Sequence, residues 1–159
     1  MVNKVTGGRQ FRQKLKQAAD NLKSGKSLKV GFLEGATYPD GTPVAYIAAI
    51  NEFGRTVSGR AGELYYQPPR PFFRNMIADK SPEWGNEMAR ILSSSNFAMG
   101  VALAHMGQHI RDQLTASIIG LESPPLAEST IKRKGFEKPL IQSKHMKESV
   151  EYSVDGSKK

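Results

Sequence analysis

Residues 24–27 (Ser-Gly-Lys-Ser) resemble the end of a phosphate-binding loop, in which backbone amides and a lysine hold phosphate. The full motif has a glycine five residues before its Gly-Lys pair, where this chain has Asp20. The motif also follows a strand, whereas this segment precedes a predicted one. We therefore interpret residues 24–27 as a helix-to-strand turn.

His105 and His109 are four residues apart, the spacing at which zinc enzymes present two ligands on one helix face. Met106 occupies the place of the catalytic glutamate in that motif, and no third ligand lies nearby in the sequence. Glu83 and Glu87 are also four apart, but they suit a solvated helix start. No Gly-x-Ser-x-Gly elbow is present. We expect no enzymatic activity, no metal and no cofactor.

The segment 68–74 (Pro-Pro-Arg-Pro-Phe-Phe-Arg) brackets two phenylalanines with two arginines. Aromatic residues and arginine are enriched at protein interfaces. The alternative is that the phenylalanines attach a helix start to the core, and at least one should do so, because adjacent helical residues point about 100° apart. The candidate interface residues are Phe53, Arg55, Tyr65, Tyr66, Arg70, Phe72, Phe73 and Arg74.

The composition indicates one basic domain, whose charged surface either is simply solvated or contacts anionic partners. The 159 residues carry 23 Lys and Arg against 15 Asp and Glu, a net charge of +8, which suits nucleic acid or acidic protein. The basic residues are scattered rather than gathered in one tail. No cysteine is present, which excludes disulfides and thiol chemistry. The first ten residues lack an apolar segment, so we expect no signal peptide. No segment approaches the ~20 apolar residues that cross a bilayer, so we expect no membrane contact.

Hydrophobic spacing predicts the elements that position these residues. Apolar residues at helical steps predict an amphipathic helix over residues 7–23, and a strand alternates through 28–33. Residues 38–41 (Tyr-Pro-Asp-Gly) predict a turn, after which Thr42 caps a helix that ends near Phe53.

A loop followed by helices is predicted after residue 53. Residues 54–70 lack a sustained period and indicate a long loop or protruding hairpin. One helix begins at 71, and Ser81-Pro82 starts another that runs to about Leu92.

The longest helix is predicted from residue 97 to about 119, capped by Ser94 or Ser95. Its apolar face carries Leu103, Met106, Ile110, Leu114 and Ile118.

The C-terminal segment is predicted to hold a short helix over 127–134 and a strand over 150–154, and between them residues 138–140 lead to a brief helical turn. The tail 155–159 should be flexible. Together the elements predict one α+β domain over residues 1–159. A small, mainly antiparallel sheet packs against one long helix, with shorter flanking helices and an extended loop.

Several segments, taken in order, form a recognisable series: 30–35, 38–42, 47–54 (ending Asn-Glu-Phe-Gly) and 68–74, followed by 125–127, 129–132, 134–135 and 138–141. This series resembles the gene-ten-like tail-component family of lambdoid long-tailed phages and prophages, over roughly residues 28 to 154. Relatives often have a shorter stretch than residues 55–67, and a glycine where this chain has Lys144.

The resemblance implies a structural virion protein of a tailed double-stranded DNA phage, a neck or tail-completion component assembled in the bacterial host cytoplasm. It implies a homo-oligomeric ring of six- or twelve-fold symmetry at the head-to-tail junction. The partners would be neighbouring neck, head-closure and tail-tube proteins, with non-specific contact to genomic DNA in the channel.

Two other functions stay open from the residues alone. The charge of +8 and the cluster at 132–134 (Lys-Arg-Lys) suit a small basic nucleic-acid-binding protein. A hydrolase is the remaining possibility, supported only by His105 and His109.

Overall fold

The protein is an α+β domain in this computed structural model, which describes residues 8–23, 25–59, 62–122 and 145–155. The helix predicted over 127–134, the segment 138–140 that leads to the predicted helical turn, and the tail beyond Asp155 lie outside these residues. In chain order the elements are α1 (Gly8–Leu22), β1 (Leu28–Phe32), α2 (Val44–Phe53), β2 (Arg55–Ser58), β3 (Leu64–Gln67), α3 (Phe72–Ser94), α4 (Met99–Gly120), α6 (His145–Glu148) and β4 (Val150–Val154).

Strands β1 and β4 form an antiparallel pair from opposite ends of the sequence. Leu28 lies opposite Val154, and Phe32 lies opposite Val150. Just beyond the pair, the Ser27 hydroxyl donates a hydrogen bond of 2.7 Å to the Asp155 carboxylate. This hydrogen bond lowers the pKa of Asp155, and the nearby Lys29 ammonium lowers it further. The strands predicted over 28–33 and 150–154 are confirmed.

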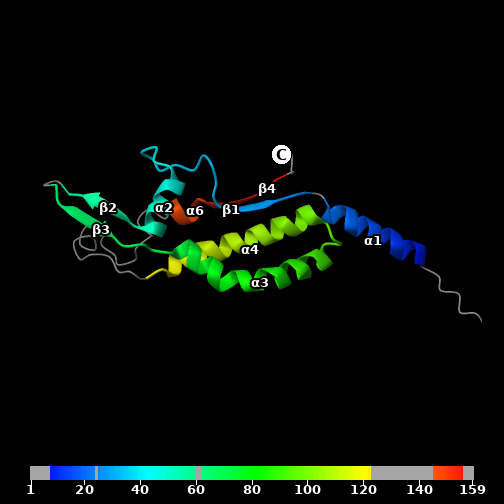
Figure 1. The fold of residues 1–159 in the computed structure, drawn as a ribbon. Coiled ribbons are helices and arrows are strands. Elements are labelled where there is room, and N and C mark those ends of the chain that lie inside the picture. The colour runs from blue at the N-terminus through cyan, green and yellow to red at the C-terminus, as the bar shows by residue number, and fades with distance from the viewer. Residues whose placement is uncertain (1–7, 24, 60–61, 123–144, 156–159) are drawn as a thin grey trace, which may run out of the picture.

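The β1–β4 sheet packs on α4, and α4 packs on α3 (Figure 1). The apolar face predicted for α4 supplies much of the core, including the fully buried Leu114 and Ile118. The prediction of one long helix is incomplete, because α3 with 23 residues is as long as α4 with 22.

Helix α3 runs unbroken through Pro82, so the two helices predicted on either side of Ser81-Pro82 are one. A proline inside a helix removes one backbone hydrogen bond and usually bends or ends the helix. Here α3 packs along α4, and beyond the proline the Trp84 indole N–H donates a hydrogen bond of 2.9 Å to Gln113 on α4. Tertiary packing on α4 therefore outweighs the local signal.

The turn between α3 and α4 differs from the prediction that a serine caps the longer helix. Ser94 ends α3, and its hydroxyl bonds back to the Ile91 carbonyl at 2.9 Å. Asn96 and Phe97 have positive φ angles of 51° and 59°, so the chain reverses at these residues. Helix α4 begins only at Met99.

The turn predicted at residues 38–41 is present. The Gly41 amide donates to the Tyr38 carbonyl at 2.9 Å. The predicted cap of α2 by Thr42 is wrong, because Pro43 is the N-cap residue and no side chain caps this helix. The Thr42 amide instead donates to the Asp40 carboxylate at 2.9 Å, which lowers the pKa of Asp40. Thr42 thus belongs to the turn.

Strands β2 and β3 resolve the choice between a loop and a hairpin at residues 54–70 in favour of a hairpin. Arg55 lies opposite Gln67, and Ser58 lies opposite Leu64. Figure 1 shows this hairpin extending from one end of the molecule, while α1 extends from the other.

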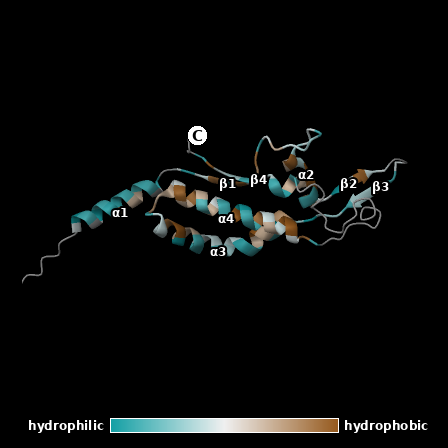
Figure 2. Ribbon diagram, turned by 180° about the vertical axis from the view of Figure 1, so that it is seen from behind, coloured by the Kyte–Doolittle hydropathy of each residue, from teal (hydrophilic) through white to brown (hydrophobic). Residues whose placement is uncertain are grey.

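Helix α1 has the predicted amphipathic sequence, and Leu15 of its predicted apolar stripe is exposed. Figure 2 shows α1 as mostly hydrophilic, whereas hydrophobic and hydrophilic segments alternate along α3 and α4. Within the described residues, no helix combines the length and hydropathy needed to span a membrane.

Candidate assembly interface

Glu52, at the end of α2, caps the start of α3. Its side chain is buried, and its two carboxylate oxygens accept hydrogen bonds from the backbone amides of Phe73 at 2.9 Å and Arg74 at 3.1 Å. The first amides of a helix have no partner within the helix, and the N-cap residue of α3, Pro71, makes no side-chain cap. A carboxylate from α2 therefore supplies the cap, and its charge suits the positive helix end.

The Arg74 guanidinium completes this contact. Its Nε donates to the Glu52 carboxylate at 2.8 Å, and its Nη2 donates to the Glu52 backbone carbonyl at 3.0 Å. The guanidinium also lies 5.2 Å from the centre of the Phe53 ring, a cation–π distance. We call Glu52, Phe53, Phe73 and Arg74 the α2–α3 clamp.

The base of the hairpin is held against the same end of α2. The Arg70 amide donates to the Asn51 carbonyl at 2.6 Å, and Gln67 donates to the Asn51 side chain at 3.3 Å. Gly54 has a φ of 74°, and a β-carbon there would lie only 2.6 Å from the Gln67 carbonyl oxygen. The Asn-Glu-Phe-Gly and Pro-Pro-Arg-Pro-Phe-Phe-Arg blocks are thus one structural unit.

The candidate interface residues divide by exposure. Phe53, Arg55, Tyr65 and Tyr66 are exposed, and the Arg74 side chain is 55% exposed. Phe72 is only 1% exposed and lies in the core, so it cannot contact a partner in this fold. The prediction that at least one phenylalanine packs in the core is confirmed by Phe72.

Arg70 is also buried, at 6% exposure, so it does not present the surface contact expected of it. Its Nε has no hydrogen-bond partner among the described residues. Burial lowers the pKa of Arg70. Its backbone amide, bonded to Asn51, is the contact by which Arg70 fixes the hairpin base.

The positions singled out for phosphate or zinc chemistry do not form a site. The segment around Gly25, whose φ is 61°, joins α1 to β1 and is the predicted helix-to-strand turn. His105 and His109 are exposed on α4, and His109 contacts the Gln113 amide at 2.9 Å. In the parts of the chain that are described, no three His, Cys, Asp or Glu residues cluster as metal ligands would.

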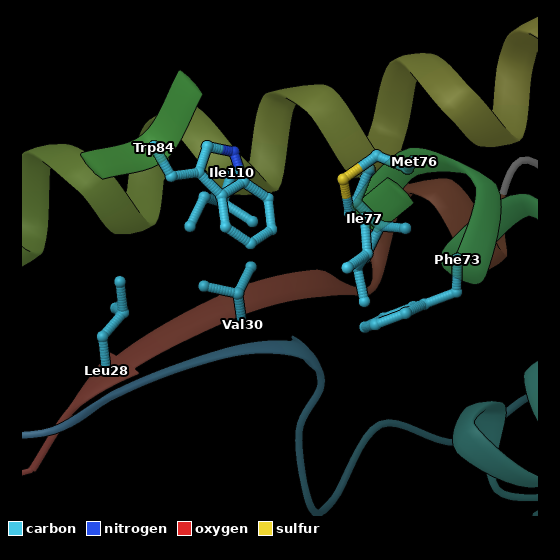
Figure 3. Close-up of a pocket in the computed structure, with 8 residues that line it drawn as sticks. Leu28, Val30, Phe73, Met76, Ile77, Trp84 and Ile110 are labelled. Carbon is cyan, nitrogen blue, oxygen red and sulfur yellow. The ribbon is translucent and has the colours of Figure 1, made fainter. Parts of the chain in front are cut away.

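The sequence did not predict two features of this part of the structure. Glu52 gave no local signal, because the amides that it caps are 21 and 22 residues away. The second feature is an apolar groove of about 210 Å³ between β1 and the two long helices (Figure 3). The groove is lined by Leu28, Val30, Phe73, Met76, Ile77, Trp84, Ile110 and Leu114.

Comparison with protein-family models, curated proteins and solved structures gave no match.

Proposed function

We propose that this chain is a structural virion protein of a tailed double-stranded DNA phage, a neck or tail-completion component that forms a ring at the head-to-tail junction. The resemblance of its ordered sequence blocks to the gene-ten-like tail-component family supports this role. The observation that carries it is the exposure of four large side chains on the hairpin and the adjoining end of α2. These side chains are Phe53, Leu64, Tyr65 and Tyr66.

Exposed aromatic side chains on a protruding hairpin favour a protein partner, because aromatic residues are enriched at protein interfaces. An isolated two-stranded hairpin is at best marginally stable in water. The β2–β3 hairpin extends from the body (Figure 1) with Leu64 72% exposed and Tyr66 67% exposed. A neighbouring subunit would stabilise it.

A ring around the DNA channel would also give the net charge of +8 a role. Cyclic assemblies repeat one heterologous interface until it closes, and six- or twelve-fold closure fits the head-to-tail junction. Basic side chains facing the channel would contact DNA through phosphates without reading its sequence. Neck, head-closure and tail-tube proteins would contact the two faces of the ring.

Electron microscopy tests this function. We expect rings from the purified protein, and virions labelled at the neck by antibodies against this chain. A protein that is strictly monomeric and absent from virions would contradict the proposal.

Helix α1 favours a second candidate function, nucleic-acid binding. It carries four basic residues against one acidic residue and extends away from the body (Figure 1). If binding DNA is the main function, the isolated monomer will bind tightly, and the logarithm of its affinity will fall linearly with the logarithm of salt concentration. Reversing the charge of Arg12 and Lys16 should then abolish binding, whereas Lys147→Glu should not. Weak binding at physiological salt would count against this function.

A further inference from the structure

Strand β1 has one edge that no described strand pairs with. It pairs with β4 on the other edge. The Asp155 amide donates to the Ser27 carbonyl, which makes these two residues a hydrogen-bonded pair. Hydrogen-bonded pairs alternate along an antiparallel ladder, so Leu28 and Val30 direct their backbone N–H and C=O groups away from β4. These groups are available to another strand.

The sheet is also too narrow for the helices beneath it. Neighbouring strands lie about 4.8 Å apart and packed helices about 8–10 Å apart, so two helices side by side match roughly four strands. The described sheet has two strands. Helix α4 packs against both, whereas Ile77 and Trp84 of α3 face β1 across the apolar groove (Figure 3). The groove is where the next strand of the sheet would lie.

The β2–β3 hairpin has the complementary properties. Each of its strands has an outer edge that no described strand pairs with. Strand β3 has four residues, close to the five of β1. Leu64 and Tyr66 are two residues apart, so they share one face of the hairpin, and both are exposed.

We propose that β3 of one copy adds to the free edge of β1 in a second copy, with Leu64 and Tyr66 covering the apolar groove. This contact is strand addition, in which main-chain hydrogen bonds supply affinity and side-chain pockets supply specificity. It would extend the described pair into a four-stranded sheet over α3 and α4. The inference rests on the self-assembly in the proposed function and identifies the two surfaces that meet.

The hairpin that fills the groove must come from another copy, because the hairpin of the same copy cannot reach it. The α2–α3 clamp and the bond from Arg70 to Asn51 fix the hairpin base at the end of α2. From there the hairpin points away from β1 (Figure 1). A contact between two different surfaces is heterologous, and such contacts close into rings or continue as filaments.

The exposed apolar area of the hairpin would supply part of an interface of standard size. Large aromatic side chains bury about 150–250 Å² each, so the exposed parts of Leu64 and Tyr66, which share the face that would cover the groove, offer on the order of 250 Å². A standard interface buries about 800 Å² per partner. The groove lining and the paired strand edges would supply the remainder.

Disulfide cross-linking tests the contact directly, because the natural chain has no cysteine. Lys29 and Tyr65 would both face away from the groove on paired strands, and both are exposed. We expect a mixture of the single variants Lys29→Cys and Tyr65→Cys to form a mixed disulfide dimer on oxidation. The double variant should form a ladder of covalent oligomers on a denaturing gel.

Two further variants control this experiment. Tyr46→Cys, on α2 and 58% exposed, should not cross-link to Lys29→Cys. Leu15→Cys tests α1 as the occupant of the groove, and cross-linking of Lys29→Cys to this variant instead of Tyr65→Cys would overturn the inference. If rings form without the Lys29–Tyr65 disulfide, strand addition is wrong and the proposed function stands. A strictly monomeric protein that forms no disulfide would contradict both.

Discussion

Replacing Glu52 with alanine is expected to lower the free energy of unfolding by about 3 kcal/mol. The change removes the acceptor for the amides of Phe73 and Arg74 and for the Arg74 guanidinium. Loss of a helix cap costs about 1 kcal/mol, and a hydrogen bond to a charged group contributes about 1.5–3 kcal/mol. Denaturant unfolding measures the loss, and hydrogen exchange at the two amides should become faster.

Two variants show whether the cap or the ion pair matters more. Glu52→Gln keeps one carbonyl acceptor, so it should lose less stability than Glu52→Ala. Arg74→Ala should lose at most about 1 kcal/mol, because exposed ion pairs contribute little and this side chain is 55% exposed. If Glu52→Ala is no less stable than Arg74→Ala, the carboxylate does not cap α3 as described.

Replacing Gly107 with alanine should destabilise the protein by about 1–3 kcal/mol through overpacking, even though alanine favours helix by about 1 kcal/mol over glycine. Gly107 lies on α4 beneath the sheet. A β-carbon there would lie 2.5 Å from the Tyr152 ring and 2.8 Å from Leu28. Helix and sheet would have to separate, which thermal or denaturant unfolding would detect.

Gly85 on α3 is the matched control. A β-carbon at Gly85 meets nothing within 4 Å, so Gly85→Ala should stabilise the protein by up to about 1 kcal/mol. The two glycine variants should therefore shift the unfolding midpoint in opposite directions. A shift of the same sign in both would contradict the close packing of α4 on the sheet.

The sequence predicted the elements that depend on local periodicity and turn chemistry. The alternation in β1 and β4, the apolar face of α4 and the turn at residues 38–41 are all present. Each of these signals lies within a few consecutive residues. The α+β class followed from the order of these elements.

The candidate interface was predicted less completely. The sequence placed aromatic residues and arginines near residue 70, but it did not distinguish the buried Phe72 and Arg70 from the exposed Tyr65 and Tyr66. Whether a side chain is buried depends on which elements pack against it in the folded protein. The residue types of the neighbouring sequence do not determine this.

Tertiary structure alone decided three features. Helix α3 continues through Pro82 because it packs along α4. Glu52 caps a helix that begins 20 residues later, because the hairpin brings the ends of α2 and α3 together. The groove lies where the two described strands of the β1–β4 sheet leave α3 partly uncovered. Each depends on contacts between residues distant in sequence, whose free energy outweighs local preference.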